Sequence, residues 1–177
     1  YCLIPKIRGK YRSYPFGDLL QEAESLGDVE LILVAQDTTR YGIDLYGKKR
    51  FAELIRALSS LENVQSIRLL YCYPEAIDDE LIAEIKNNRK VAKYIDIPLQ
   101  HSEDRILKLM NRRGSRTEYL HLIEKLRGAV PGIAIRSTFI AGFPTETEEE
   151  VAALGEFLRE AKLTNCGFFA YSREPET

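Results

Sequence analysis

The chain has 177 residues, of which 45% are hydrophobic and 10% aromatic, and its formal charge at pH 7 is −2. This length and composition are typical of one folded domain with a substantial core, and they exclude an intrinsically disordered chain. The near-neutral charge gives no overall attraction to nucleic acid or to an anionic membrane. No apolar run reaches the length of a membrane span, and the first residues show no signal-peptide pattern.

The sequence contains three cysteines, Cys2, Cys72 and Cys166, whose wide spacing is unlike the framework of a secreted disulfide-rich domain. We therefore expect a cytoplasmic protein. The sequence begins Tyr1-Cys2, without a methionine, and stops a few residues after its last apolar run. We expect this chain to be a trimmed portion of a larger protein.

Apolar runs of strand length alternate along the chain with amphipathic stretches of helical spacing. Helices are predicted at residues 16–26, 51–61, 79–86, 104–110, 117–130 and 148–162, and strands at residues 29–35, 67–73, 94–99, 133–143 and 166–171. Two helix starts fit the capping-box spacing, Ser115 with Glu118 and Thr145 with Glu148. The acidic run at residues 146–150 is then explained by the helix dipole rather than by a metal site.

Apolar strands separated by helices indicate a parallel sheet that is buried on both faces. Two arrangements fit this order, a doubly wound open sheet and a whole or partial barrel. No glycine-rich dinucleotide fingerprint follows the first strand, which argues against a Rossmann cofactor site. Polar residues instead lie within or just after the strands, and in a barrel the carboxyl ends of the strands converge on one mouth. These residues are Gln36, Asp37, Thr38, Asp96, Gln100, His101, Arg136, Ser137, Thr138, Ser172 and Arg173.

Five local sequences resemble, in order and spacing, the central domain of the RimO-type methylthiotransferases, which are radical S-adenosylmethionine enzymes. They are YCLIPKIRG (residues 1–9), LVAQDTTRYG (33–42), RLLYCYP (68–74), YIDIPLQH (94–101) and FIAGFP (139–144). The resemblance implies one domain over residues 1–177, an α/β fold that is a partial parallel (β/α) barrel lacking its first strand. The segment with Gln36, Asp37 and Thr38 resembles the branch that modifies a ribosomal protein rather than the tRNA-modifying branches.

In that superfamily, a loop after the first barrel strand carries three cysteines spaced C-x₃-C-x₂-C, which ligate a four-iron, four-sulfur cluster. By the match, Cys2 is the third of these cysteines and therefore a metal ligand, and Tyr1 is the aromatic residue near the adenine of S-adenosylmethionine. The first two cysteines are not in this sequence, so we expect the isolated chain to hold no complete cluster and to be inactive. Cys72 and Cys166 are expected to be small core residues rather than ligands.

The polar residues of the expected mouth fit the needs of S-adenosylmethionine, which has an amino acid, a ribose and an adenine. The resemblance assigns Gln36 and Asp37 to its amino group. Further contacts with this cofactor are expected from Gln100, His101, Arg136, Thr138 and Phe143. An ion pair with Asp96 inside the barrel is an equally good interpretation of Arg136. Thr145 stands where the family usually has a glycine, which leaves the local adenine contact open.

The resemblance implies a transferase that adds a methylthio group to the β-carbon of an aspartate in small-subunit ribosomal protein twelve. Its cofactors would be a 4Fe-4S cluster and S-adenosylmethionine, and its partners the ribosomal protein or ribosome and an electron donor. We assign no acid–base residue, because the cofactors carry the chemistry. The family's amino-terminal cluster domain and carboxyl-terminal substrate-binding domain are not in this sequence. We expect no membrane partner and no direct nucleic-acid binding by this domain.

Other interpretations stay open. One is the core of a tRNA methylthiotransferase, and another is a non-catalytic module, which the missing cysteines favour. A phosphate-binding barrel of the aldolase kind would need a lysine at a strand end or a glycine-rich phosphate loop, and the sequence shows neither. Lys6, Arg8, Lys10 and Arg12 form a basic stretch that is either a solvated loop or a surface facing an acidic or phosphate-rich partner.

Overall fold

A computed structural model describes residues 2–175 of the chain. Its centre is a layer of five parallel strands: β1 (Val29–Leu33), β2 (Val64–Leu69), β3 (Tyr94–Asp96), β4 (Ala134–Ala141) and β5 (Asn165–Ala170). One sheet pairs β1 with β2, and the other has the order β3-β4-β5. Hydrogen bonds from Ala92 N to Ile67 O and from Cys72 N to Asp96 O join the two sheets. The five strands therefore form one curved array in chain order.

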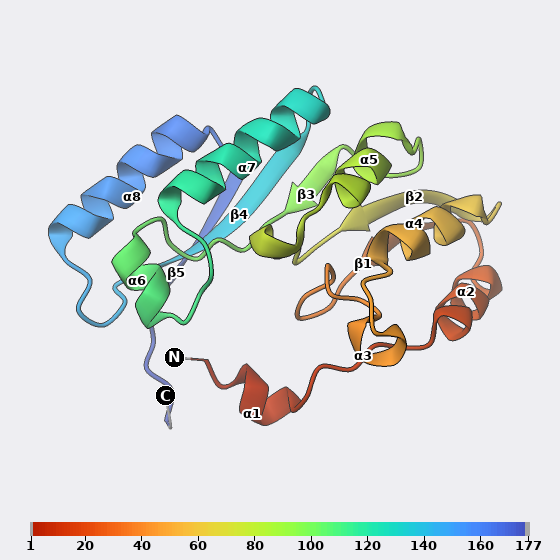
Figure 1. The fold of residues 1–177 in the computed structure, drawn as a ribbon, viewed down its shortest axis with the longest axis horizontal. Helices are drawn as coiled ribbons and strands as arrows, with labels where there is room; N and C mark the ends of the chain where they lie inside the picture. The colour runs from red at the N-terminus through yellow and green to blue at the C-terminus, as the bar shows by residue number, and fades with distance from the viewer. Residues whose placement is uncertain (1, 176–177) are drawn as a thin grey trace.

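The longer helices form a layer on one side of this array (Figure 1). In that layer α2 packs on α4, α4 on α5, α5 on α7 and α7 on α8. The bounds are α2 (Phe16–Ser25), α3 (Ile43–Tyr46), α4 (Phe51–Ser60), α5 (Asp79–Asn87), α6 (Asp104–Leu109), α7 (Arg116–Ala129) and α8 (Glu148–Ala161), with a 3₁₀ turn at Pro74–Ala76. Strands in chain order under one helix layer are the arrangement of a barrel, whereas a doubly wound sheet carries helices on both faces. The fold is a partial parallel (β/α) barrel, as the sequence predicts.

The main core lies between the strands and the helix layer. Phe139 of β4 is fully buried there, stacked on Phe168 of β5 and edge-on to Phe157 of α8. The opposite, concave face of the array is open: the exposed fraction is 52% for Ile32 and 64% for Phe169. The prediction of a sheet buried on both faces is therefore wrong for this face, because only one layer of helices covers the strands.

The start of α8 also differs from its prediction. Thr147, not Thr145, is the N-cap: its hydroxyl accepts from Glu150 N, and the Glu150 carboxylate accepts from Thr147 N. Thr145 has a φ of +71°, a left-handed conformation that belongs to a tight turn before the helix. At the start of α7, Ser115 accepts from Glu118 N as predicted.

The segment before α2 lies apart from the helix layer (Figure 1). It contains a short helix, α1 (Ile4–Arg8), none of whose residues is buried. The sequence pattern did not predict α1, since a helix of this length has no apolar periodicity to detect. Among residues 2–175, no helix has both the length and the apolar character that spanning a membrane requires.

Candidate functional site

The carboxyl ends of the five strands form one continuous rim, because a hydrogen bond crosses from each strand end to the next. The bonds are Thr38 N to Tyr71 O (3.2 Å), Cys72 N to Asp96 O (2.9 Å), Gln100 N to Thr138 O (2.9 Å) and Tyr171 N to Ala141 O (2.8 Å). Tyr71 and Gln100 both have positive φ angles, 55° and 73°. Such conformations are uncommon for residues with a side chain and often occur at functional sites. The rim is therefore the natural place for a site in this fold.

An open groove of about 380 Å³ lies at the β4–β5 part of this rim. The strand side of the groove is mostly apolar and includes Ile140, Phe169 and Tyr171. The other side comes from the amino-terminal segment, where the exposed Cys2 lines the groove with its neighbours Leu3, Ile4 and Ile7. The structure thus brings the Cys2 thiol to the carboxyl rim of the strands, where it is accessible to a ligand.

Asp96 and Arg136 form an ion pair on the concave face. Arg136 Nη1 donates to Asp96 Oδ1 at 2.5 Å, and Tyr71 N donates to Asp96 Oδ2 at 3.1 Å. The Asp96 side chain is only 2% exposed, whereas that of Arg136 is 39% exposed. The bond to Asp96 raises the pKa of Arg136 because it stabilises the cation. The ion pair predicted as an alternative exists, and it leaves part of the guanidinium facing the concave side.

Gly167 of β5 lies beside this guanidinium. A Cβ at position 167 would lie 3.6 Å from Arg136 Nη2 and 3.7 Å from Thr138 Oγ1. The Arg136 guanidinium and the Thr138 hydroxyl therefore both lie close to the backbone of Gly167, which carries no side chain. A cation next to a hydroxyl suits a carboxylate or a sugar hydroxyl of a ligand.

The two residues predicted to contact an amino group lie in the loop after β1. Gln36 is exposed, and Asp37 is buried. Asp37 Oδ1 accepts from both the amide and the hydroxyl of Thr39, and its backbone carbonyl accepts from Tyr11 Oη at 3.1 Å. Burial raises the pKa of the Asp37 carboxyl. Oδ1 of Asp37 is therefore used to stabilise the loop after β1.

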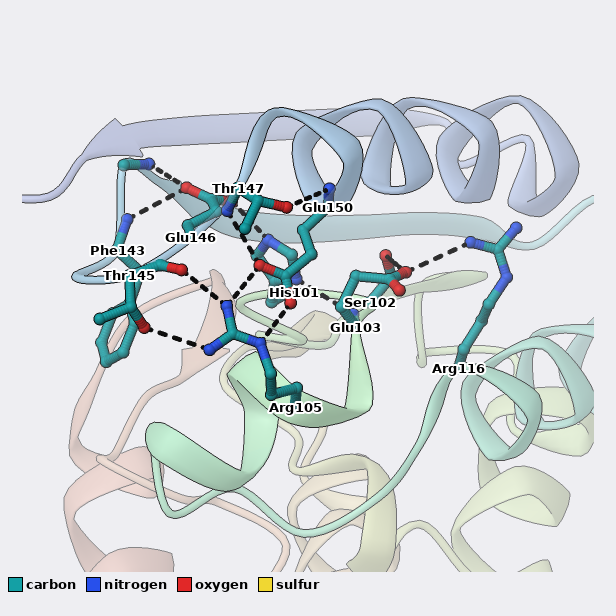
Figure 2. A network of polar contacts seen from close by, with 11 residues as sticks. His101, Ser102, Glu103, Arg105, Arg116, Phe143, Thr145, Glu146, Thr147 and Glu150 are labelled. Carbon is teal, nitrogen blue, oxygen red and sulfur yellow. Dashed lines mark hydrogen bonds and ion pairs between the residues drawn. The ribbon is translucent and has the colours of Figure 1, made fainter.

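His101 lies in the loop after β3 and is fully buried (Figure 2). Its Nδ1 accepts from Glu103 N at 3.0 Å, so its proton lies on Nε2, which donates to Glu146 Oε1 at 2.7 Å. Both ring nitrogens therefore have protein partners. The resemblance predicts direct contact between His101 and the cofactor, but in this structure both ring nitrogens are bonded to protein groups and the ring is buried.

The remaining predicted residues are distributed around the rim. Phe143 is buried beside Ile106 and Met110, and its ring meets that of Tyr171 edge-on with centroids 5.4 Å apart. Gln100 is half-buried and continues the β3–β4 pairing through its backbone. Tyr1 lies outside the described residues.

One residue of the site was not predicted from the sequence. Glu146 was placed there in the first turn of a helix. A capping box read at residues 147–150 would have shown that Glu146 precedes the helix.

The two other cysteines differ from Cys2. Cys72 is fully buried, and burial raises the pKa of its thiol to about 12, which agrees with a core role. Cys166 is exposed because β5 is an edge strand, so the prediction of a core residue is wrong there. Within residues 2–175, no three His, Cys, Asp or Glu side chains are grouped so as to hold a metal ion. Of the described thiols, the one on the groove is Cys2.

Comparison with known proteins gives the family. The sequence profile of the Radical SAM superfamily matches residues 1–158. The chain belongs to this superfamily. Membership implies a 4Fe-4S cluster and S-adenosylmethionine as cofactors of the complete enzyme. The residues present fit these groups in part: Cys2 presents an exposed thiol at the rim, and Arg136 and Thr138 present a cation and a hydroxyl beside Gly167.

Curated relatives are longer than this chain. The chain is 55% identical to the ribosomal protein uS12 methylthiotransferase RimO of Clostridium botulinum strain Eklund 17B, covering all of this chain and 40% of that protein. It is 52% identical to the protein of the same name from Caldanaerobacter subterraneus subsp. tengcongensis, again over the whole chain and 41% of the relative. The chain therefore spans about two fifths of the length of these relatives.

Two solved structures share the fold at low sequence identity. Streptococcus suis SuiB, in complex with its precursor peptide SuiA, aligns with a TM-score of 0.63 and 16% identity over 93% of this chain and 34% of its own. Elp3 of Methanocaldococcus infernus aligns with a TM-score of 0.57 and 13% identity over 90% of this chain and 41% of its own. At such identities the likeness establishes the barrel architecture and nothing about substrates.

Proposed function

We propose that the complete protein is a methylthiotransferase, and that this chain is the domain that binds and cleaves S-adenosylmethionine. The substrate would be the β-carbon of an aspartate in ribosomal protein uS12, and the reaction would take place in the cytoplasm with an external electron donor. The observation that carries the proposal is the exposed Cys2 thiol on a groove at the carboxyl rim of a partial parallel barrel. The 52–55% identity to uS12 methylthiotransferases over the whole chain supports the choice of substrate.

Residues of the groove and of the adjoining part of β4 would bind different parts of the cofactors. Cys2 would ligate the cluster, which when bound supplies the electron for reductive cleavage of S-adenosylmethionine. Arg136 and Thr138 would bind a carboxylate or ribose hydroxyl beside Gly167. The apolar strand side of the groove would receive the adenine and exclude water from it.

The loops after β1 and β3 would complete the site. Gln36, which is exposed, and Asp37 would recognise the amino group of S-adenosylmethionine. The backbone amide of Gln100 donates to the Thr138 carbonyl, so the backbone or side chain of Gln100 would contact the cofactor beside Thr138. Since both ring nitrogens of His101 are occupied, this residue would act through the protein rather than through the ligand.

The test is to incubate the complete, anaerobically reconstituted protein with S-adenosylmethionine, a reductant and one of three substrates: uS12, uS12 with the target Asp replaced by Asn, or tRNA. Mass spectrometry of the products would detect the added methylthio group. We expect modification of uS12 alone. Modification of tRNA, with uS12 unchanged, would replace this proposal with the tRNA-modifying function.

A further inference from the structure

A buried pair of side chains holds the loop that follows β4. The Glu146 side chain is only 2% exposed, and its two carboxylate oxygens have different partners. Oε1 accepts from His101 Nε2 at 2.7 Å, and Oε2 accepts from two consecutive backbone amides, those of Gly142 and Phe143. Figure 2 shows Glu146 between the ring of His101 and the loop backbone. A residue of the loop after β3 is therefore linked, through Glu146, to the backbone that follows β4.

The loop is also fixed at its far end. Arg105 of α6 donates to Thr145 O at 2.7 Å and forms a two-bond ion pair with Glu150 at the start of α8. This ion pair lowers the pKa of Glu150 to about 2. The turn at residues 142–145 is thus held between two anchors, of which the His101–Glu146 pair is the buried one. A loop held this way has little freedom to change shape when a ligand binds.

The fixed backbone is connected to the groove through one aromatic contact. The amide of Phe143 is bound by Glu146, and the ring of Phe143 packs edge-on against Tyr171, which lines the groove. Ile140, two residues before the first held amide, lines the groove as well. A displacement of Gly142 and Phe143 would therefore move the groove wall, although neither His101 nor Glu146 reaches the groove.

We propose that His101 and Glu146 are positioning residues that set the β4 side of the groove for the nucleoside part of S-adenosylmethionine. The inference rests on the proposed binding of that cofactor in the groove. His101 supplies an Nε2–H donor that orients the Glu146 carboxylate, and the carboxylate orients two peptide units of the rim. The bond that matters for the groove is the one from Nε2, whereas the bond accepted by Nδ1 only fixes the ring.

Two substitutions at one position separate these bonds. In His101→Gln the side-chain amide nitrogen reaches the position of Nε2 and keeps the donor to Glu146. In His101→Asn the side-chain oxygen takes the position of Nδ1, which keeps the acceptor for Glu103 N but loses the donor. Each variant loses one hydrogen bond and some packing volume, so each is a control for the other.

The measurements use the complete protein with reconstituted cluster. Hydrogen exchange followed by mass spectrometry would report on the peptide spanning residues 139–147, with residues 52–60 of α4 as the reference. Calorimetry would give the dissociation constant of S-adenosylhomocysteine, which is not cleaved. For His101→Asn we expect at least about tenfold faster exchange in peptide 139–147 and about tenfold weaker binding, as for a lost hydrogen bond to a charged group. For His101→Gln we expect both quantities within about threefold of wild type.

Equal effects of the two variants on exchange and on binding would overturn the inference and leave His101 a purely structural residue. If His101→Asn does not fold, Glu146→Asp is the second variant. It keeps the charge but is one methylene too short to reach both His101 and the two amides, so it should show the same faster exchange, and wild-type exchange would overturn the inference. Failure of wild type to bind S-adenosylhomocysteine would instead refute the proposed function, and the exchange comparison would still decide whether the His101–Glu146 bond fixes the loop after β4.

Discussion

The two sides of the groove are built very differently. Behind the strand side, the side chains of His101 and Glu146 are buried and bonded to each other and to backbone, and no buried side-chain polar atom of residues 2–175 lacks a partner. On the other side, α1 has no buried residue and the Cys2 thiol is exposed. The barrel therefore fixes the wall proposed to receive the nucleoside. The segment that carries the thiol has little packing of its own, and we expect a bound cluster to order it.

The largest effect on stability is expected from replacing Arg136 of β4, which pairs with the buried Asp96. Arg136→Met leaves the buried Asp96 carboxylate with only the Tyr71 amide as partner, so we expect the free energy of unfolding to fall by about 2–3 kcal/mol. Urea unfolding of the apo protein at neutral pH measures this. Arg136→Lys, which keeps a cation, should lose less. If Arg136→Met lowers the free energy of unfolding no more than Arg136→Lys does, the buried Asp96 carboxylate does not depend on the ion pair.

A smaller loss of unfolding free energy is expected when Arg105 is replaced, and this loss should depend on pH. The ion pair lowers the pKa of Glu150 to about 2 in the folded state from an ordinary 4.5, so the folded protein binds fewer protons at this group than the unfolded one. The stabilisation is therefore complete above about pH 4.5 and is lost as the pH falls towards 2. Since the Arg105 side chain is half exposed and screened by solvent, Arg105→Met should lower the free energy of unfolding at pH 6 by less than Arg136→Met does.

The measurement is the difference in unfolding free energy between wild type and Arg105→Met at pH 6 and at pH 2.5. We expect that difference to shrink at the lower pH. A difference that stayed constant, or grew, would mean that the Arg105–Glu150 pair is not what fixes the far end of the loop.

The smallest effect is expected on the open side. Ile7 is 69% exposed on α1, so Ile7→Ala removes almost no buried surface. We expect the unfolding free energy of the apo protein to change by less than about 0.5 kcal/mol. If the loss reached the range expected for a core residue, the amino-terminal segment would be packed in the apo protein and the contrast between the two sides would disappear.

The sequence predicted the parts of the molecule that depend on local pattern. Apolar runs located all five strands, and the resemblance directed attention to Cys2. The pattern could not predict the bond between His101 and Glu146, because it joins residues 45 positions apart in two different loops. It misplaced Cys166 because exposure on an edge strand depends on what lies beside the sheet. It placed a helix start at Thr145 because spacing alone does not reveal a left-handed residue.

The central claim, that Cys2 is a cluster ligand on the rim, is tested most directly by iron binding. The complete protein, its Cys2→Ala variant and its Cys166→Ala variant would be reconstituted anaerobically with iron and sulfide, and their iron content and release of 5′-deoxyadenosine compared. Cys166 is the matched control, since it is an exposed thiol that does not line the groove. We predict that Cys2→Ala loses both the bound iron and the cleavage of S-adenosylmethionine, while Cys166→Ala keeps them. Normal iron content and normal cleavage in Cys2→Ala would contradict the account.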